Sequence, residues 1–187
     1  MSDKSRNKYR NASARAQWWN YGQAGAYFVT ICTQHRKPFF GEIRAGEMKP
    51  SAIGAIAEQE WWKTLDIRMD MNLQRGEFVV MPNHIHGIII IGKNQYNAKI
   101  DTEPGRNAMH GVPTPRNKFG PQSKNLASII WGFKSAVTQR ARLIQVDFAW
   151  QPRFHDRIIR DHDEYQRIAH YIITNPTRWN EDTFYPE

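Results

Sequence analysis

Hydrophobic residues along the chain follow two patterns, one typical of strands and one typical of helices. Runs rich in β-branched and aromatic residues, bounded by Gly, Pro or Asn, predict buried strands. Four such runs occur, at 27–33, 78–81, 84–92 and 148–154. Pro82 and Asn83 form a natural turn between the second and third runs, so these strands are expected to pair as a hairpin. Pro152 confines the fourth strand to a sheet edge or a bulge.

Three other segments repeat their apolar residues every three or four positions, which predicts amphipathic helices. The first follows Ser51, a residue type that caps helix N-termini, and the second starts at Asn125. The third begins at Asp161, with Glu164 as its capping partner, and ends before Pro176. The order β-α-β-β-α-β plus a helix predicts an α+β, ferredoxin-like fold: an antiparallel sheet with helices on one face and a further C-terminal helix.

Turn-forming and basic residues indicate a single domain with flanking segments. Residues 1–24 are a basic N-terminal arm, which serves either phosphate contact or solubility. Residues 25–176 form the domain, and within it 92–124 is a long basic insertion that we expect to be mobile. Insertions of this length are usually either functional or disordered. Residues 177–187 are predicted to be a C-terminal tail.

The amino-acid composition indicates which class of partner and which cellular compartment to expect. The 187 residues include 26 Lys and Arg against 18 Asp and Glu, a net charge of +8. This balance favours a polyanionic partner, most simply nucleic acid. The single cysteine, Cys32, excludes an intramolecular disulfide and a cysteine-built zinc site, and it fits a reducing cytosol. The sequence has neither a secretion signal nor a membrane-spanning window, so we expect a cytoplasmic protein without a membrane partner.

His84 and His86 lie in the run MPNHIHG, directly before four isoleucines. Because alternate residues of a strand face the same side, both imidazoles are expected on one face of the sheet. Two neighbouring imidazoles can bind a divalent metal. Such pairs also arise in strands where histidines only bond to backbone carbonyls, so the motif alone leaves both interpretations open.

The last predicted helix has an apolar stripe and, beside it, two polar groups. The stripe residues recur at helical spacing and are expected to pack on the sheet: Tyr165, Ile168, Ala169 and Ile172. Tyr171 lies off this stripe, and Asn175 stacks on the same side one turn later. The helix therefore presents a hydroxyl and an amide oxygen together. His170 points away from the stripe and is expected to be solvated.

Four motifs follow one another along the chain: 27–30, the histidine run 81–87, 154–160 and the tyrosine run 171–176. In content, order and separation they resemble the REP-associated tyrosine transposases, within the single-tyrosine HUH group of single-strand DNA nucleases. The first motif is similar to the family's first strand, and the third to the entry of its tyrosine helix. The resemblance spans most of the chain.

The resemblance implies a catalytic domain that nicks and rejoins single-stranded DNA at repeat hairpins. Tyr171 would attack a DNA phosphate and form a 5′-phosphotyrosine bond, so strands are transferred without ATP. His84, His86 and Asn175 would hold a divalent metal, Mg²⁺ or Mn²⁺, that stabilises charge on the phosphate oxygens. Related enzymes act as monomers or as homodimers that exchange the tyrosine helix.

The expected DNA contacts lie in the basic arm, in the 92–124 insertion and on the second helix, whose basic face meets either phosphate or solvent. They are Lys4, Arg6, Lys8, Arg10, Arg116, Lys118, Lys124 and Lys134. The partner would be single-stranded or hairpin DNA, which would associate this cytoplasmic protein with the nucleoid.

Two other functions fit the same residues. In a metal-dependent hydrolase, His84 and His86 bind zinc and water attacks. Its activity survives Tyr171→Phe, and no covalent adduct forms. In a catalytically silent hairpin-binding module, DNA binding persists with EDTA and in His84→Ala.

Overall fold

The computed structural model describes residues 19–98 and 123–185. Its centre is a four-stranded antiparallel sheet in the order β4-β5-β1-β6. These strands are β1 (Gly25–Cys32), β4 (Leu73–Val80), β5 (His84–Ile91) and β6 (His155–Ile159). This is the strand order of a ferredoxin-like sheet, so the predicted fold class is confirmed.

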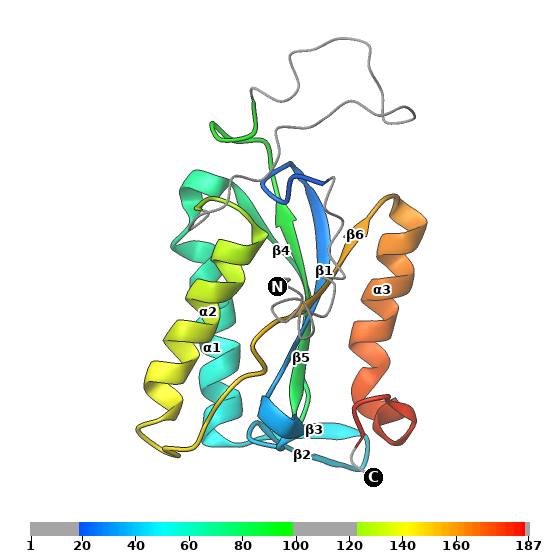
Figure 1. Cartoon of the computed structure of the whole chain (residues 1–187). Coiled ribbons are helices and arrows are strands. Elements are labelled where there is room, and N and C mark those ends of the chain that lie inside the picture. The colour runs from blue at the N-terminus through cyan, green and yellow to red at the C-terminus, as the bar shows by residue number, and fades with distance from the viewer. Residues whose placement is uncertain (1–18, 99–122, 186–187) are drawn as a thin grey trace, which may run out of the picture.

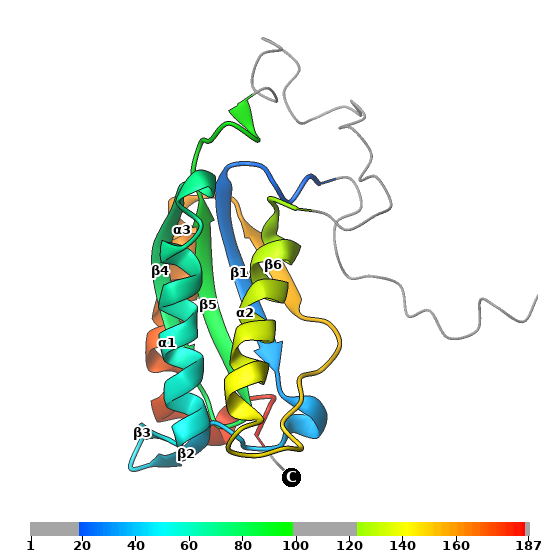
Figure 2. The same cartoon turned by 90° about the vertical axis from the view of Figure 1, so that its left-hand side faces the viewer.

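Helices cover both faces of the sheet (Figures 1 and 2). The pair α1 (Ala52–Asp66) and α2 (Leu126–Ala141) lies on one face, as predicted. The C-terminal helix α3 (His162–Thr174) lies on the other. None of the helices within the described residues is long and apolar enough to cross a membrane.

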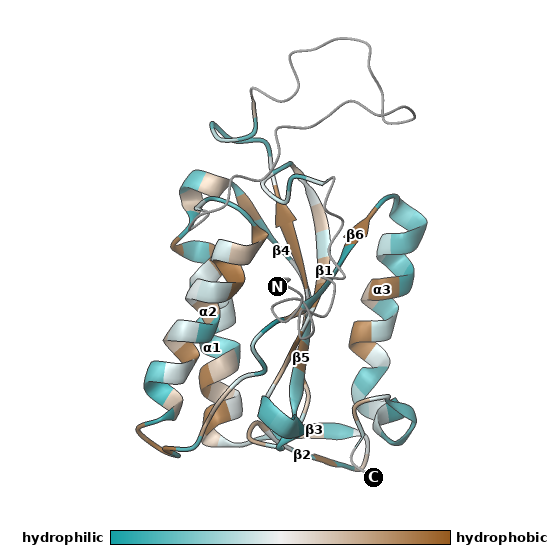
Figure 3. Ribbon diagram, viewed as in Figure 1, coloured by the Kyte–Doolittle hydropathy of each residue, from teal (hydrophilic) through white to brown (hydrophobic). Residues whose placement is uncertain are grey.

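Alternation along the two central strands sends side chains to two separate hydrophobic clusters. Tyr27 and Val29 of β1, with Ile85 and Ile89 of β5, face α1 and α2. Ile88 of β5 instead packs with α3, in the smaller cluster. Figure 3 shows this as hydrophobic strands between helices that are hydrophilic on their outer sides. His84 and His86 have the same parity as Ile88, so they share the α3 face of the sheet.

The predicted caps fix where each helix begins. Ser51 accepts a hydrogen bond from the Gly54 N–H at the start of α1. Asn125 and Ser128 form a reciprocal capping box at the start of α2. Asp161 accepts from the Glu164 N–H at the start of α3, as predicted. The Glu164 carboxylate bonds to the Arg160 N–H, one residue before the cap.

The predicted fourth strand is in the wrong place. Residues 148–154 make one isolated bridge, between Trp150 and Thr33, and the strand β6 follows at His155–Ile159. Phe148 is fully buried and Trp150 packs against the core, so the aromatic residues fill the interior under a connecting segment. Pro152 has no N–H for a ladder, and the strand begins only after it. β6 pairs only with β1, at the sheet edge.

The predicted second strand begins too late. β4 starts at Leu73, five residues before the predicted Phe78. Its first half includes the polar residues Gln74 and Arg75, which interrupt the hydrophobic pattern that predicts a strand. Polar residues occur there because β4 lies at the edge of the sheet and is exposed to solvent. The register shifts between Arg75 and Phe78, and a side chain at Gly76 would lie within 3 Å of Ile88. The glycine therefore permits the bulge.

Smaller elements complete the described residues. A hairpin of β2 (Gly41–Arg44) and β3 (Glu47–Pro50) forms a separate two-stranded sheet. Short 3-10 turns lie at Gln34–Arg36, Met69–Met71 and Asn175–Glu181, the last labelled η4. The segment predicted as a tail, 177–187, thus begins inside η4, and Trp179 in it is buried. The basic arm up to residue 18 and most of the predicted insertion, 99–122, lie outside the described residues.

Candidate metal centre and nucleophile

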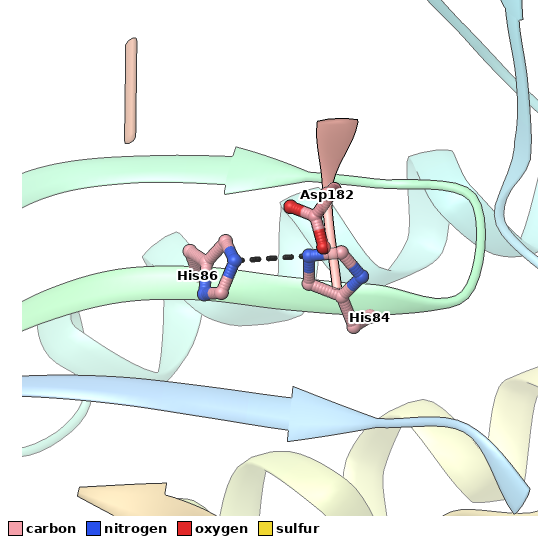
Figure 4. Close-up of side chains that lie close together, drawn as sticks. All are labelled: His84, His86 and Asp182. Carbon is pink, nitrogen blue, oxygen red and sulfur yellow. Dashed lines mark hydrogen bonds between the residues drawn. The ribbon is translucent and has the colours of Figure 1, made fainter. Parts of the chain in front are cut away.

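The two histidines of β5 face each other through their Nε2 atoms. These atoms are 2.9 Å apart (Figure 4), and both histidines are buried, at 0% and 1% exposed. Two ligands that each lie about 2.1 Å from one ion, at right angles, are about 3.0 Å apart. The spacing therefore fits a pair of ligands to one shared divalent ion.

Each imidazole is oriented by a partner at its other nitrogen. His84 Nδ1 lies 2.8 Å from Asn83 Oδ1, an acceptor, so His84 holds its proton there and turns an Nε2 lone pair toward His86. His86 Nδ1 lies 2.8 Å from the hydroxyl of Thr30, which can donate or accept. Such partners of the remote nitrogen are what fixes the tautomer of metal-binding histidines.

Both histidines are neutral at neutral pH. Burial lowers the pKa of His84 well below 6.5, and the neighbouring His86 and Arg36 lower it further. Burial also lowers the pKa of His86 to about 4. Neutral imidazole is the form that binds a metal, so neither histidine would have to lose a proton first.

Asp182 joins the two histidines from the far end of the chain. One ligand atom from each of the three residues lies within 4.8 Å of the others, and the carboxylate sits beside the His84 ring (Figure 4). Asp182 Oδ1 accepts from the Phe184 N–H at 2.7 Å, which leaves Oδ2 turned toward Tyr171 and Asn175. Two imidazoles and a carboxylate are a donor set used by catalytic metals.

Asp182 is not among the residues predicted from the sequence, because it falls in the predicted tail. A carboxylate without a periodic pattern around it gives no local signal. Trp179 and Phe184 on either side were the available hint, since two large aromatics are unusual in a solvated tail. Both pack near His84, with ring centroids 5.9 Å and 4.6 Å from the imidazole.

Asn175 follows directly after α3 and is buried beside Asp182. Its Nδ2 donates to Asp182 Oδ2 at 2.9 Å. Its Oδ1 is buried without a hydrogen-bond partner among the described residues. An unpaired buried amide oxygen is costly, and a cation is one way to satisfy it. The role of Asn175 as a metal ligand stays a prediction.

Tyr171 projects from α3 toward the histidines. Its hydroxyl lies 3.1 Å from His86 Nε2 and 3.5 Å from Asp182 Oδ2, and its ring meets Phe28 edge-on. The side chain is still 40% exposed, so the hydroxyl can meet a ligand from solvent. Burial, and then the negative charge of Asp182, raise the pKa of Tyr171 to about 12. The phenol is therefore protonated at neutral pH and needs help to act as a nucleophile.

The structure places the other predicted residues as follows. Tyr165 packs on the sheet with the α3 stripe, and His170 is exposed, as predicted. Lys124 pairs with Asp70 and lies 4.9 Å from the centre of the Tyr96 ring. Lys134, on the opposite side of the sheet from α3, donates to the Gln151 carbonyl. The predicted DNA contacts outside the described residues are Lys4, Arg6, Lys8, Arg10, Arg116 and Lys118.

The comparisons with known proteins agree with this architecture. No protein-family model matches the sequence. An uncharacterised protein of Haemophilus influenzae is 32% identical over an alignment of 185 residues, and the match covers 95% of this chain and 94% of that protein. The solved structure of a REP-associated tyrosine transposase bound to a REP hairpin has a TM-score of 0.55 and 17% identity, and the match covers 88% of this chain and 74% of that one. The chain therefore belongs to the same family as the Haemophilus influenzae protein, and it has the fold of the REP-associated tyrosine transposase.

Proposed function

We propose that this protein is a DNA transposase that nicks and rejoins single-stranded DNA at repeat hairpins through a 5′-phosphotyrosine intermediate. The observation that supports this most strongly is the position of the Tyr171 hydroxyl, 3.1 Å from His86 Nε2 and next to the His84–His86 pair. A nucleophile beside a metal-binding donor set is the arrangement that phosphoryl transfer requires.

In the proposed site, His84, His86 and Asp182 bind a divalent metal, Mg²⁺ or Mn²⁺, and Asn175 is the predicted amide ligand. The unpaired Oδ1 of Asn175 and the 2.9 Å approach of the two imidazole Nε2 atoms support this donor set. When bound, such an ion stabilises negative charge on the phosphate oxygens and on the leaving oxygen.

The nicking step exchanges one phosphate ester for another. The Tyr171 oxygen forms a bond to phosphorus, the bond from phosphorus to the 3′ oxygen breaks, and the 3′ oxygen leaves with a proton. The phenol proton passes to Asp182 Oδ2, the nearest carboxylate oxygen, 3.5 Å away, and from there to the departing 3′ oxygen, so one proton moves in the step and none is consumed. Because the ester bond is conserved, attack by a 3′ hydroxyl on the phosphotyrosine rejoins the strand and regenerates the phenol.

Charge and fold support DNA as the substrate. The net charge of +8 favours a polyanion, and the solved transposase with this fold is bound to a REP hairpin. We extend the proposal to the predicted DNA contacts in the basic arm and in the 92–124 insertion, which includes Lys124. The Lys134 ammonium already donates to the Gln151 carbonyl, which makes it less available for a phosphate.

The test is to incubate the protein with Mn²⁺ and a labelled single-stranded oligonucleotide bearing the repeat hairpin found beside its gene. We expect a protein–DNA adduct that survives a denaturing gel. The matched control is Tyr171→Phe, which removes only the hydroxyl and should abolish the adduct, while Mn²⁺ affinity stays within about threefold.

Each other outcome selects one of the alternative functions. Cleavage that persists in Tyr171→Phe without an adduct would mean that water is the nucleophile and the protein is a hydrolase. Tight hairpin binding without cleavage, unchanged by EDTA and by His84→Ala, would mean a silent DNA-binding module.

A further inference from the structure

Asn83, in the turn between β4 and β5, uses both ends of its side-chain amide. Its Oδ1 lies 2.8 Å from His84 Nδ1, and its Nδ2 donates to the Phe184 carbonyl at 2.8 Å. The residue is 1% exposed, so neither bond competes with bulk water. One buried amide thus connects a histidine of the sheet to a segment 101 positions later in the chain.

The backbone of Asn83 is fixed as firmly as its side chain. Its carbonyl accepts from both the N–H and the hydroxyl of Thr33, each at 2.9 Å. In the same turn, the Met81 N–H donates to the His84 carbonyl at 2.8 Å. Asn83 therefore presents its amide from a rigid support.

The bond to Phe184 also reaches Asp182. The Phe184 N–H donates to Asp182 Oδ1 at 2.7 Å, so the position of the Phe184 backbone helps to determine how the carboxylate is turned. The Phe184 ring packs on His84 with 4.6 Å between ring centroids. Moving Phe184 would consequently move the carboxylate away from the histidines.

We propose that Asn83 is a positioning residue that couples two metal ligands. Its Oδ1 holds His84, and its Nδ2 holds the Phe184 backbone, whose N–H in turn holds Asp182. This inference rests on the proposed metal centre. An amide is required because it alone offers an acceptor and a donor on one short planar group, whereas a carboxylate offers only acceptors. In this proposal Asn83 acts through His84 and Asp182 and is not itself a ligand.

The test is a double-mutant cycle read out as Mn²⁺ affinity by isothermal titration calorimetry. Asn83→Asp keeps the acceptor for His84 but faces the Phe184 carbonyl with a carboxylate instead of a donor. We expect it to weaken Mn²⁺ binding about tenfold, the low end for a lost outer partner. In the Asp182→Asn background the same change should cost less than about twofold, because the ligand that it positions is already gone.

Thr30→Val is the matched control, since it removes the hydroxyl partner of His86 without touching the 182–184 segment. Its effect on Mn²⁺ affinity should be the same factor in both backgrounds. Circular dichroism melts identify folded variants, and Asn83→Ser replaces Asn83→Asp if the aspartate variant does not fold. The smaller cost in the Asp182→Asn background is expected for either variant.

Equal costs of the Asn83 change in both backgrounds, or no cost in either, would overturn the coupling while leaving the metal centre intact. A wild-type protein that binds no Mn²⁺ would overturn the proposed function together with this inference. The two failures are therefore distinguishable from one set of titrations.

Discussion

Two oxygen-bearing side chains beside Tyr171 differ in what they can give a cation. Asp182 offers an anionic oxygen, whereas Asn175 offers a neutral one and also donates its Nδ2 to Asp182. Hard divalent cations bind carboxylates more strongly than amides. In the proposed metal centre, Asp182 would therefore contribute more of the metal affinity than Asn175, the oxygen ligand predicted from the sequence.

We expect Asp182→Asn to weaken Mn²⁺ binding at least about tenfold, and Asn175→Ala to weaken it less, by about threefold. The first change removes the ligand charge, and the second removes a neutral oxygen and one support of that charge. Calorimetric titration of both variants checks the order. If Asn175→Ala costs more than Asp182→Asn, the amide is the principal oxygen ligand, as the family resemblance implies.

The sequence identifies the residues of this site unevenly. Strand and helix periodicity place His84 and His86 on one face and Tyr171 off the apolar stripe of its helix, whereas their predicted roles come from the family resemblance. Asp182 could not be placed in this way, because it reaches the histidines only after η4 reverses the chain, and a reversal leaves no periodic trace. The roles of Asn83 and Thr30 depend on hydrogen bonds across the sheet, which spacing does not encode.

Among the elements, α3 determines the position of Tyr171, the proposed nucleophile. Its N-terminus is held by the Asp161 cap and by Glu164, which pairs with Arg157 of β6. Its apolar stripe packs on Ile88 of β5, two residues after His86. Packing at one end of α3 and capping at the other therefore fix the position of Tyr171 relative to the two histidines.

Removing the α3 cap should weaken the fold without disturbing the metal centre. Asp161→Ala should lower the free energy of unfolding by about 1 kcal/mol, the usual cost of a lost N-cap. Asp161→Asn, which keeps an acceptor for the Glu164 N–H, is the control and should cost less. Urea denaturation measures both, and Mn²⁺ affinity should stay within about twofold, since Tyr171 and Asn175 lie at the other end of α3.

Residues 148–154 are predicted as a strand. In the structure, Lys134 of α2 instead holds this segment through hydrogen bonds. Burial lowers the pKa of Lys134 to about 8, against about 10.4 in an unfolded chain. Between these values the unfolded chain binds the proton more readily, so the stability contributed by this residue rises with pH. Aromatic patterning could not distinguish this fastened connection from a strand, because both bury alternate rings.

Lys134→Met removes this titration. The wild-type protein should therefore gain stability relative to the variant, on the order of 1 kcal/mol, from about pH 7.5 to about pH 10, a modest value because the side chain is partly exposed. Urea denaturation of both proteins at the two pH values gives the difference. Parallel stability profiles would show that the Lys134 amine titrates normally.

Across the whole molecule, the proposed metal centre joins parts of the chain that lie far apart in the sequence. His84 and His86 come from the middle of the sheet, whereas Asp182 follows α3 near the end of the described residues. The order of the main strands and helices could be predicted because the hydrophobic residues of each repeat with a characteristic period. The approach of the C-terminal segment to β5 could not be predicted in this way. A cation bound there would hold the two together.

Such closure should make the stability of the protein depend on the metal. An ion that binds only the folded state adds about 2.7 kcal/mol at a free concentration one hundred times its Kd. We therefore expect Mn²⁺ to raise the melting temperature of the wild-type protein, and EDTA to reverse the rise. His84→Ala should show no rise, and Tyr171→Phe should keep it, because the proposed role of the hydroxyl is that of a nucleophile and not of a metal ligand. A rise that persists in His84→Ala would place the bound cation elsewhere on the protein.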